Sequence, residues 1–300
     1  MNTSLTKKID FAVIMRVANA NPNGDPLNGN RPRAGYDGIG EITDVCLKRK
    51  LRDRLQEMGE AIFVQSDDRK SDDAKSLQAR ASAALGDKLG SDEMRALACK
   101  TWFDVRTFGQ LFAYKAKASK KKAAKKPEDK EDSDEGDSGI SIAIRGPVTV
   151  QSAFSLMPVD ITSTQITKSV SGEDPKEGKN RASDTMGMKH RVDQAIYVVY
   201  GSMNPQLAER TGFSDVDAEK IKAVLPRLFE NDASSARPEG SMEVLRVIWW
   251  QHNSKAGQYS SAKVHQTLRD ELKNSQDGDF DKARLENALD GLKPQIIDGF

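Results

Sequence analysis

Residues 9–33 decide the fold, and they read IDFAVIMRVANANPNGDPLNGNRPR. The run from Ile9 to Val17 is almost wholly apolar, which predicts a buried strand. The loop from Asn19 to Arg33 follows, and its density of Asn, Gly and Pro favours a tight path with positive φ angles. Such a path leaves backbone N–H groups free, so we predict that this loop contacts phosphate or ribose.

A helix is predicted directly after the loop. Thr43 suits the N-cap position, and apolar residues then recur at helical spacing in one stripe: Leu47, Leu51, Leu55 and Met58. The other faces carry cations: Lys48, Arg49, Lys50, Arg52 and Arg54. An ordinary surface helix mixes charge signs through i,i+4 pairs, but here the acidic residues are outnumbered. We therefore predict that this helix binds a polyanion.

Composition limits the possible classes of protein. The chain has 300 residues and is 37% hydrophobic, which is enough for one domain with insertions or two small ones. Its net charge of +1 restricts any nucleic-acid site to a local surface. Cys46 and Cys99 have neither metal-binding nor redox spacing, so we expect free thiols. Without a signal-like N-terminus or a long apolar run, the chain is predicted to be cytoplasmic.

The middle of the chain reads as an insertion spanning residues 60–138. Two helical stretches are predicted, from Asp72 to Leu85 and from Ser91 to Leu97. The insertion ends in a low-complexity tract at 115–138, where a Lys/Ala run meets an acidic run. Such a tract cannot bury a core, so we predict a disordered loop whose role stays open.

Regular elements follow the tract in a recognisable order. We predict one long strand from Ile140 to Phe154 with a bend at Gly146-Pro147, then a strand at 191–203, a helix from 215 or 217 to 229, and a strand at 242–250. Together with the first strand and helix, these give βαββαβ, the order of an α+β, ferredoxin-like domain such as the RNA-recognition motif. The aromatic signature of that motif is missing, so base stacking on the sheet is not expected. His252 is predicted to be a surface residue at a strand end.

Residues 159–190 read as an extended β-hairpin that projects from the sheet. Its exposed Thr, Lys and Met residues suit contacts with a nucleic-acid backbone or a base step. A hairpin that docks on a neighbouring subunit needs nothing different, so both readings stay open.

Several segments together carry a family resemblance: the loop 19–33, the helix start at 42–53, and the stretches 104–109, 145–152 and 189–201. They resemble the backbone subunit of the type I-C CRISPR Cascade complex, one of the right-hand-shaped CRISPR backbone proteins. The resemblance covers nearly the whole chain. It implies a single domain with the sheet as palm, the insertion as fingers and the hairpin as thumb.

The resemblance implies a non-catalytic protein that polymerises head-to-tail along the guide RNA and presents it to target DNA. Its expected partners are crRNA, target DNA, copies of itself and other Cascade subunits, with neither metal nor cofactor. The residues expected to bind RNA are Arg16, Asn19, Asn21, Asn23, Gly24, Lys48, Arg49, Arg52, Arg106 and Arg145. The expected thumb residues are Thr164, Lys168, Met186, Met188 and Lys189. Arg106 and Arg145 suit structural ion pairs as well as phosphate.

Two alternative functions stay open at this point. Related backbone subunits of RNA-targeting complexes cut RNA with a loop aspartate, and Asp25 lies in a comparable loop. The histidines His190, His252 and His265 show no metal-ligand spacing. The fold is also compatible with a stand-alone RNA-binding regulator.

Overall fold

The protein is seen here in a computed structural model, which describes residues 4–91, 93–114, 140–167 and 186–300. The charged tract predicted at 115–138 and the thumb residue Lys168 lie outside the described residues.

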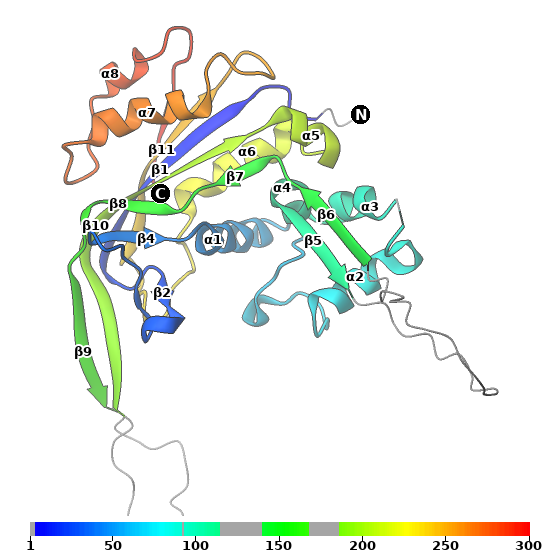
Figure 1. The fold of residues 1–300 in the computed structure, drawn as a ribbon, viewed down its shortest axis with the longest axis horizontal. Coiled ribbons are helices and arrows are strands. Elements are labelled where there is room, and N and C mark those ends of the chain that lie inside the picture. Colours follow the sequence, from blue (N-terminus) through cyan, green and yellow to red (C-terminus); the bar gives the residue numbers. More distant parts are fainter. Residues whose placement is uncertain (1–3, 92, 115–139, 168–185) are drawn as a thin grey trace, which may run out of the picture.

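An eight-stranded antiparallel sheet forms the centre of the molecule (Figure 1). Its strand order is β12-β11-β1-β10-β8-β4, and β7 and β9 also pair with β10. The strands are β1 (Ile9–Ala20), β4 (Ile39–Ile42), β7 (Val148–Val150), β8 (Ala153–Pro158), β9 (Ile161–Thr167), β10 (Met186–Met203), β11 (Met242–Gln251) and β12 (Gln295–Asp298). The central strand β1 is buried on both faces, which explains why its sequence is continuously apolar rather than alternating.

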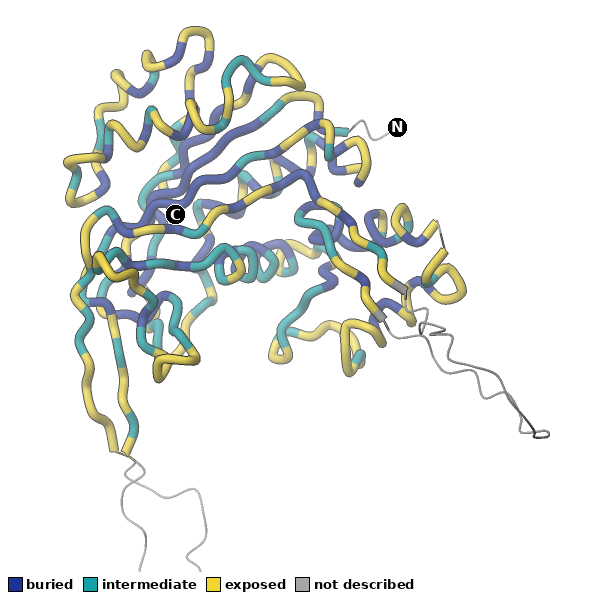
Figure 2. The backbone as a smooth tube through the Cα atoms, in the orientation of Figure 1, coloured by how far each residue is buried: buried dark blue, intermediate teal, exposed yellow. Residues whose placement is uncertain are grey.

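Helices cover both faces of this sheet. On one face lie α1 (Asp44–Glu57) and α6 (Asp215–Val224), and on the other lie α7 (Ser261–Leu272) and α8 (Lys282–Glu286). The adjacent residues Trp249 and Trp250 alternate along β11, so that each enters a different core. Figure 2 shows the buried residues concentrated in the strands between these layers. α7 and α8 therefore cover part of the second face.

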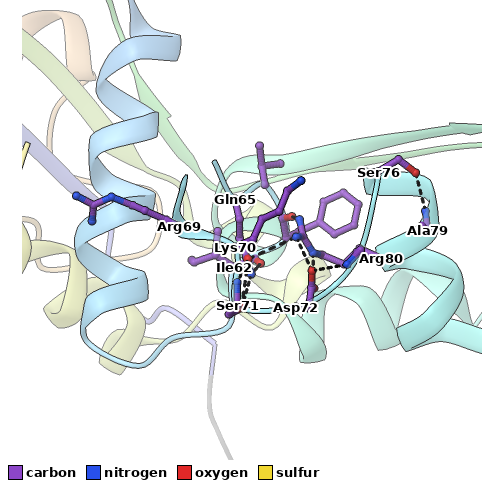
Figure 3. A network of polar contacts seen from close by, with 12 residues as sticks. Ile62, Gln65, Arg69, Lys70, Ser71, Asp72, Ser76, Ala79 and Arg80 are labelled. Carbon is purple, nitrogen blue, oxygen red and sulfur yellow. Dashed lines mark hydrogen bonds and ion pairs between the residues drawn. The ribbon is translucent and has the colours of Figure 1, made fainter. Parts of the chain in front are cut away.

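A third apolar cluster lies beside the sheet. It is built from α2 (Leu77–Leu85), α3 (Met94–Thr101), α4 (Phe103–Phe108) and the separate two-stranded sheet of β5 (Gly109–Tyr114) and β6 (Ile140–Arg145). The rings of Phe63, Trp102 and Phe112 pack together at its centre. At the edge of this cluster, the Arg80 guanidinium donates to both carboxylate oxygens of Asp72 and to the carbonyl of Phe63 (Figure 3). These residues thus form a second body with its own core.

The prediction of one long strand from Ile140 to Phe154 is wrong. The stretch forms three strands: β6 pairs with β5, whereas β7 and β8 pair with β10. The bend at Gly146-Pro147 separates them, because the backbone there crosses that of residues 107–109. A Cβ on Gly146 would lie 2.3 Å from the carbonyl oxygen of Thr107. At the predicted bend, the chain therefore passes from one sheet to another.

Other element boundaries also differ from the predictions. The helix predicted at 215–229 ends at Val224 and continues as the 3₁₀ turn η4 (Leu225–Arg227), since Pro226 cannot extend the hydrogen-bonding pattern. The first predicted insertion helix begins only at Leu77, where Ser76 caps it. The second is α3, shifted to Met94–Thr101. The prediction that Met58 belongs to the apolar stripe of α1 is wrong, because it is the exposed C-cap residue.

The prediction for His252 is also wrong: its side chain is buried at the end of β11. The Gln258 N–H donates to His252 Nδ1 at 2.9 Å, so the imidazole proton resides on Nε2, which donates to Asp10 Oδ2 at 2.9 Å. His252 therefore fixes the loop between β11 and α7 onto β1. In the described part of the chain, no helix is both long and apolar enough to cross a membrane.

Candidate nucleic-acid interface

The loop 19–33 folds into a small ordered unit on the sheet. It contains the strands β2 (Gly24–Asp25) and β3 (Arg31–Pro32) and the 3₁₀ turn η1 (Pro26–Asn28) between them. Asn19, Gly29 and Asn30 have φ angles of 54°, 58° and 60°, so the predicted positive-φ path is confirmed.

Several amides of this loop are not free, contrary to the prediction. The N–H of Asn21 donates to the Ala236 carbonyl at 2.9 Å, and that of Asn30 donates to the Asp25 carbonyl at 2.8 Å. The N–H of Arg33 reaches the carbonyl of Asn23 at 3.1 Å. The first of these bonds ties the loop to Ala236, and the other two close the β2–β3 unit on itself. The composition of the loop does not reveal these partners.

The side chains predicted to bind RNA in this loop have mainly structural contacts. Asn21 is buried and donates from Nδ2 to the Asn30 carbonyl. Asn23 Oδ1 accepts from both the N–H and the hydroxyl of Thr43, each at 2.9 Å, and so ties the loop to the N-cap of α1. A Cβ on Gly24 would lie 2.0 Å from Asn30 Oδ1. Asn19, in contrast, is exposed at the end of β1.

Two residues outside the predicted set stand out, Tyr36 beside this loop and Arg31 within it. Tyr36 is fully exposed at the tip of a tight turn, which the Asp37 carboxylate holds by accepting from the Ile39 N–H at 3.0 Å. An exposed ring of this kind can stack on a base. Arg31 donates from Nη1 to Ser163 Oγ at 3.1 Å and so joins the loop to β9. In the sequence, the signal for Tyr36 is that it is the single aromatic residue in the turn Gly35-Tyr36-Asp37-Gly38.

The hairpin predicted at 159–190 corresponds to a ribbon of β9 and the first residues of β10. Their register pairs Ile161 with Val192 and continues to Thr167 opposite Met186. Figure 1 shows this ribbon extending away from the sheet. Because directly opposed side chains share a face, the register assigns every ribbon residue to one of two faces.

The two faces of the ribbon differ in chemistry. One carries Thr162, Thr164, Lys189 and Arg191, and we call it the basic face. The other carries Ser163, Gln165, Met186, Met188 and His190, and we call it the methionine face. Both methionines are more than half exposed. The predicted thumb residues are therefore divided, with Thr164 and Lys189 on the first face and Met186 and Met188 on the second.

The cations of α1 all have acidic partners, contrary to the predicted excess of positive charge. Lys48 and Arg49 pair with Asp44 and Asp53 one turn away, each at 2.9 Å. The remaining pairs are Lys50–Asp232, Arg52–Asp104 and Arg54–Glu57. Lys50 and Arg54 are buried. The contribution of this helix to RNA binding stays a prediction, but its charges already stabilise the fold.

Arg52 illustrates this structural role. Its Nε donates to Asp104 Oδ2 at 2.9 Å, and its guanidinium lies 5.1 Å from the ring centroid of Phe108. The buried Asp104 carboxylate also accepts from the N–H groups of Phe63 and Val64. One buried carboxylate therefore connects α1, α4 and the start of the insertion.

The other predicted arginines lie apart from the loop and ribbon. Arg16 is exposed on β1 and pairs with Glu243 of β11. Arg106 binds the Asp217 carboxylate with two nitrogens, at 2.9 and 3.2 Å, which is a structural ion pair. Arg145 lies near the opposite end of β10 from the ribbon, beside α5 (Pro205–Thr211).

The family model described as CRISPR-associated protein Cas7 matches residues 7–286. The chain belongs to the Cas7 family. The family-level prediction made from the sequence is thus confirmed. The match includes the loop, the ribbon and all the predicted site residues, and it ends before β12.

Three relatives of this Cas7 chain have identities between 14% and 28%. The CRISPR-associated protein Cas7 of Haloferax volcanii is 28% identical over 234 residues, which cover 76% of this chain. The matched part is 65% of that relative, so the alignment leaves about a third of it unmatched. A chain of a "CRISPR RNA-guided surveillance complex, pre-nicking" has 18% identity and a TM-score of 0.40, with 81% of this chain and 75% of that chain covered. A chain of a "CRISPR RNA-guided surveillance complex" has 14% identity and a TM-score of 0.42, with 90% and 86% covered.

Proposed function

We propose that this Cas7 protein is a non-catalytic, crRNA-binding backbone subunit of a type I-C Cascade complex, acting in the cytoplasm. Several copies line up head-to-tail along the guide RNA, together with other Cascade subunits, and present the guide for pairing with target DNA. A guide varies in sequence while its backbone does not, so the binding surface must recognise phosphate and ribose.

The observation that carries this proposal is a pair of cations without acidic partners among the described residues, Lys189 on the basic face of the ribbon and Arg31 where the ordered loop meets the opposite face. Within the described residues, Lys189 has no ion-pair partner, and its nearest cross-strand neighbour is the hydroxyl-bearing Thr164. Arg31 lies at the junction of loop and ribbon and contacts a serine rather than an acid. Cations and hydroxyl groups without base-specific geometry are the side chains that hold a nucleic-acid backbone. Exposed Tyr36 adds a platform for a base.

The connectivity of the sheet supports the ferredoxin-like assignment. Along the chain, α1 follows β1, the strands β7 and β8 precede β10, and α6 precedes β11. In space, the order β11-β1-β10-β8 places the first and third strands of the expected motif in the middle. We interpret this as two interleaved βαβ units, with the ribbon as the thumb.

We assign polymerisation to the methionine face of the ribbon. Unbranched thioether side chains adapt to irregular surfaces, which suits Met186 and Met188 to contact either a neighbouring copy or a displaced base step. A projecting ribbon that meets a different surface on the next copy makes a heterologous contact, and such contacts generate open filaments.

RNA binding tests the proposal directly. We expect the purified protein to bind oligouridylate and oligoadenylate of equal length with similar affinity. Arg31→Ala with Lys189→Ala should weaken both and reduce the log–log salt slope by about 0.7 for each phosphate that the variant no longer neutralises. Lys282→Ala is the matched control, because this exposed lysine lies on α8, away from the loop. Binding that is strong for one sequence and absent for the other would instead indicate a sequence-specific regulator.

The non-catalytic assignment has a separate test at Asp25. This carboxylate accepts from the Leu27 N–H at 3.2 Å and lies 3.4 Å from Arg33, so it holds the loop in shape. We expect no cleavage of complementary RNA by the RNA-loaded protein with Mg²⁺. Cleavage that disappears in Asp25→Asn would establish the nuclease alternative.

A further inference from the structure

A groove opens between α5 and α7, at the far end of β10 from the ribbon. It has a volume of about 600 Å³ and is walled by the end of β6, the start of α5 and the loop that leads into α7. The base of the ribbon at Val192 and the groove residue Ser202 are ten positions apart on one strand, which is roughly 33 Å. The α5–α7 groove is therefore distinct from the loop-and-ribbon surface (Figure 1).

The lining of the α5–α7 groove is that of a phosphate site. Its cations are Lys8, Arg145 and Lys255, and its uncharged hydrogen-bonding side chains are Ser202, Asn204, Gln206, Ser260 and Ser261. No carboxylate lines it among the described residues. Four other grooves of the described chain each include at least one, such as Asp25, Asp217, Asp232 and Asp277. Cations combined with hydroxyl and amide groups are the usual partners of phosphate oxygens.

Arg145 is the cation most available to a ligand. Its exposed side chain has no acidic partner in the part of the chain that the structure describes. The tight crossing at Gly109 and Gly146 fixes the backbone beside it, and the Asn204 N–H binds the Pro147 carbonyl at 3.0 Å. These contacts fix the backbone of Arg145 near the start of α5, and its side chain lines the groove.

The other two cations are already engaged, to different degrees. Lys255 pairs with Glu209 at 2.5 Å, but both side chains are about half exposed, and a pair of this kind contributes little. A phosphate can therefore compete for Lys255. Lys8 donates to the Tyr259 carbonyl at 2.8 Å and lies 3.4 Å from the buried Asp10. It is therefore held in place and contributes mainly positive charge to the lining of the groove.

The amino end of α7 adds backbone donors to the same groove. Its N-cap Ser260 satisfies only the N–H of Lys263, and within the described residues the amides of Ser261 and Ala262 have no acceptor. This helix is 12 residues long, and its dipole places partial positive charge at that end. Helix amides beside arginine and lysine form a common anion site.

We propose that the α5–α7 groove binds the backbone phosphates of a second stretch of the single-stranded RNA held by the loop and ribbon. This inference rests on the proposed function and adds a contact to it. A strand that engages both sites crosses the protomer along β10. One copy then holds RNA at two points, which keeps the segment between them extended.

The test compares two sets of variants on the full chain. Arg145→Ala with Lys255→Ala should weaken binding of an oligouridylate of about 20 nucleotides by about fivefold to tenfold. The salt slope should fall by about 0.7 for each phosphate that the groove no longer neutralises. Combining the groove variant with the loop variant, Arg31→Ala with Lys189→Ala, should weaken binding further than either variant does alone. Lys282→Ala should leave the affinity unchanged. Equal urea midpoints would show that the groove variant is folded.

Hydrogen exchange supplies an independent readout. RNA should slow exchange of the amides of Ser261 and Ala262 in the wild type, and should do so less in the groove variant. Uridine monophosphate at equal phosphate concentration should give little protection. Equal protection by the mononucleotide would overturn the proposal in favour of a small-ligand site.

The remaining outcomes separate this inference from the proposed function. If the groove variant binds RNA like the wild type while the loop variant does not, the groove proposal fails and the proposed function stands. If the groove variant only loses association between protein copies, the groove contacts protein and the proposal also fails. If the wild type binds no RNA at all, both are wrong.

Discussion

Replacement of Arg52 by alanine separates a structural role of α1 from a role in RNA binding. The change removes the guanidinium that contacts Asp104 and Phe108. The Asp104 carboxylate, which is 1% exposed, then has lost the cation that it pairs with. Breaking a buried ion pair by removing one partner costs about 3–5 kcal/mol. The N–H groups of Phe63 and Val64 still hold this carboxylate, so we expect the lower end, about 3 kcal/mol.

The matched control for Arg52→Ala lies one turn away on the same helix. Lys48 pairs with Asp44 at the surface, so Lys48→Ala should cost about 0.5 kcal/mol or less. Urea unfolding followed by tryptophan fluorescence measures both changes. A double-mutant cycle with Asp104→Asn should give a coupling energy above about 1.5 kcal/mol, because the two groups contact directly.

RNA affinity decides the interpretation of the Arg52 variant. Under conditions where Arg52→Ala is still folded, we expect its affinity for RNA to stay within about twofold of the wild type. A stability loss below about 1 kcal/mol, together with weakening of RNA binding as large as that of the loop variant, would refute the structural role and support the predicted contribution of α1 to RNA binding.

Two further predictions concern the packing and the pH dependence of the fold. Gly146→Ala should destabilise the protein by about 1–3 kcal/mol, because its Cβ would lie 2.3 Å from a backbone oxygen. The control Gly187→Ala should cost much less, because its Cβ would meet the Ile166 side chain at 3.4 Å. Equal urea midpoints for the two variants would contradict this account. Burial lowers the pKa of His265, although Asp10 and the Gly201 carbonyl oppose the effect, so the unfolded chain takes up a proton first as the pH falls. Stability is then fully present above pH 6.5 and declines below it, by at most about 1.4 kcal/mol per pH unit for this group. Urea midpoints between pH 7 and pH 5 should therefore fall less in His265→Gln than in the wild type, and an equal fall in both would count against the buried neutral imidazole.

Elements with a strong local signal could be predicted from the sequence. The N-cap at Thr43 and the apolar spacing from Leu47 to Leu55 identified α1, because cap and stripe are properties of neighbouring residues. β1, β10 and β11 were recognised for the same reason, as long runs rich in branched apolar residues. Short elements such as β4 were missed, and so was the C-terminal helix α7, although Ser260 caps it and Val264, Leu268 and Leu272 recur at helical spacing.

Properties that depend on distant partners could not be predicted. Lys50 and Arg52 find their acids in Asp232 and Asp104, far along the chain, so the charge count of the helix alone was misleading. The division of 140–158 between two sheets likewise depends on pairing with β5 and β10. At the candidate site, Tyr36 became noticeable only because the fold leaves its ring fully exposed.

The most direct test of the proposed function is the mass of the protein–RNA assembly as a function of RNA length. Native mass spectrometry on oligouridylates of increasing length, before and after nuclease digestion, counts the copies and measures the protected RNA. The proposal predicts stepwise addition of whole protomers, with protected fragments that grow by a constant increment. One fixed mass at every RNA length would contradict a polymerising backbone and favour a stand-alone RNA-binding protein.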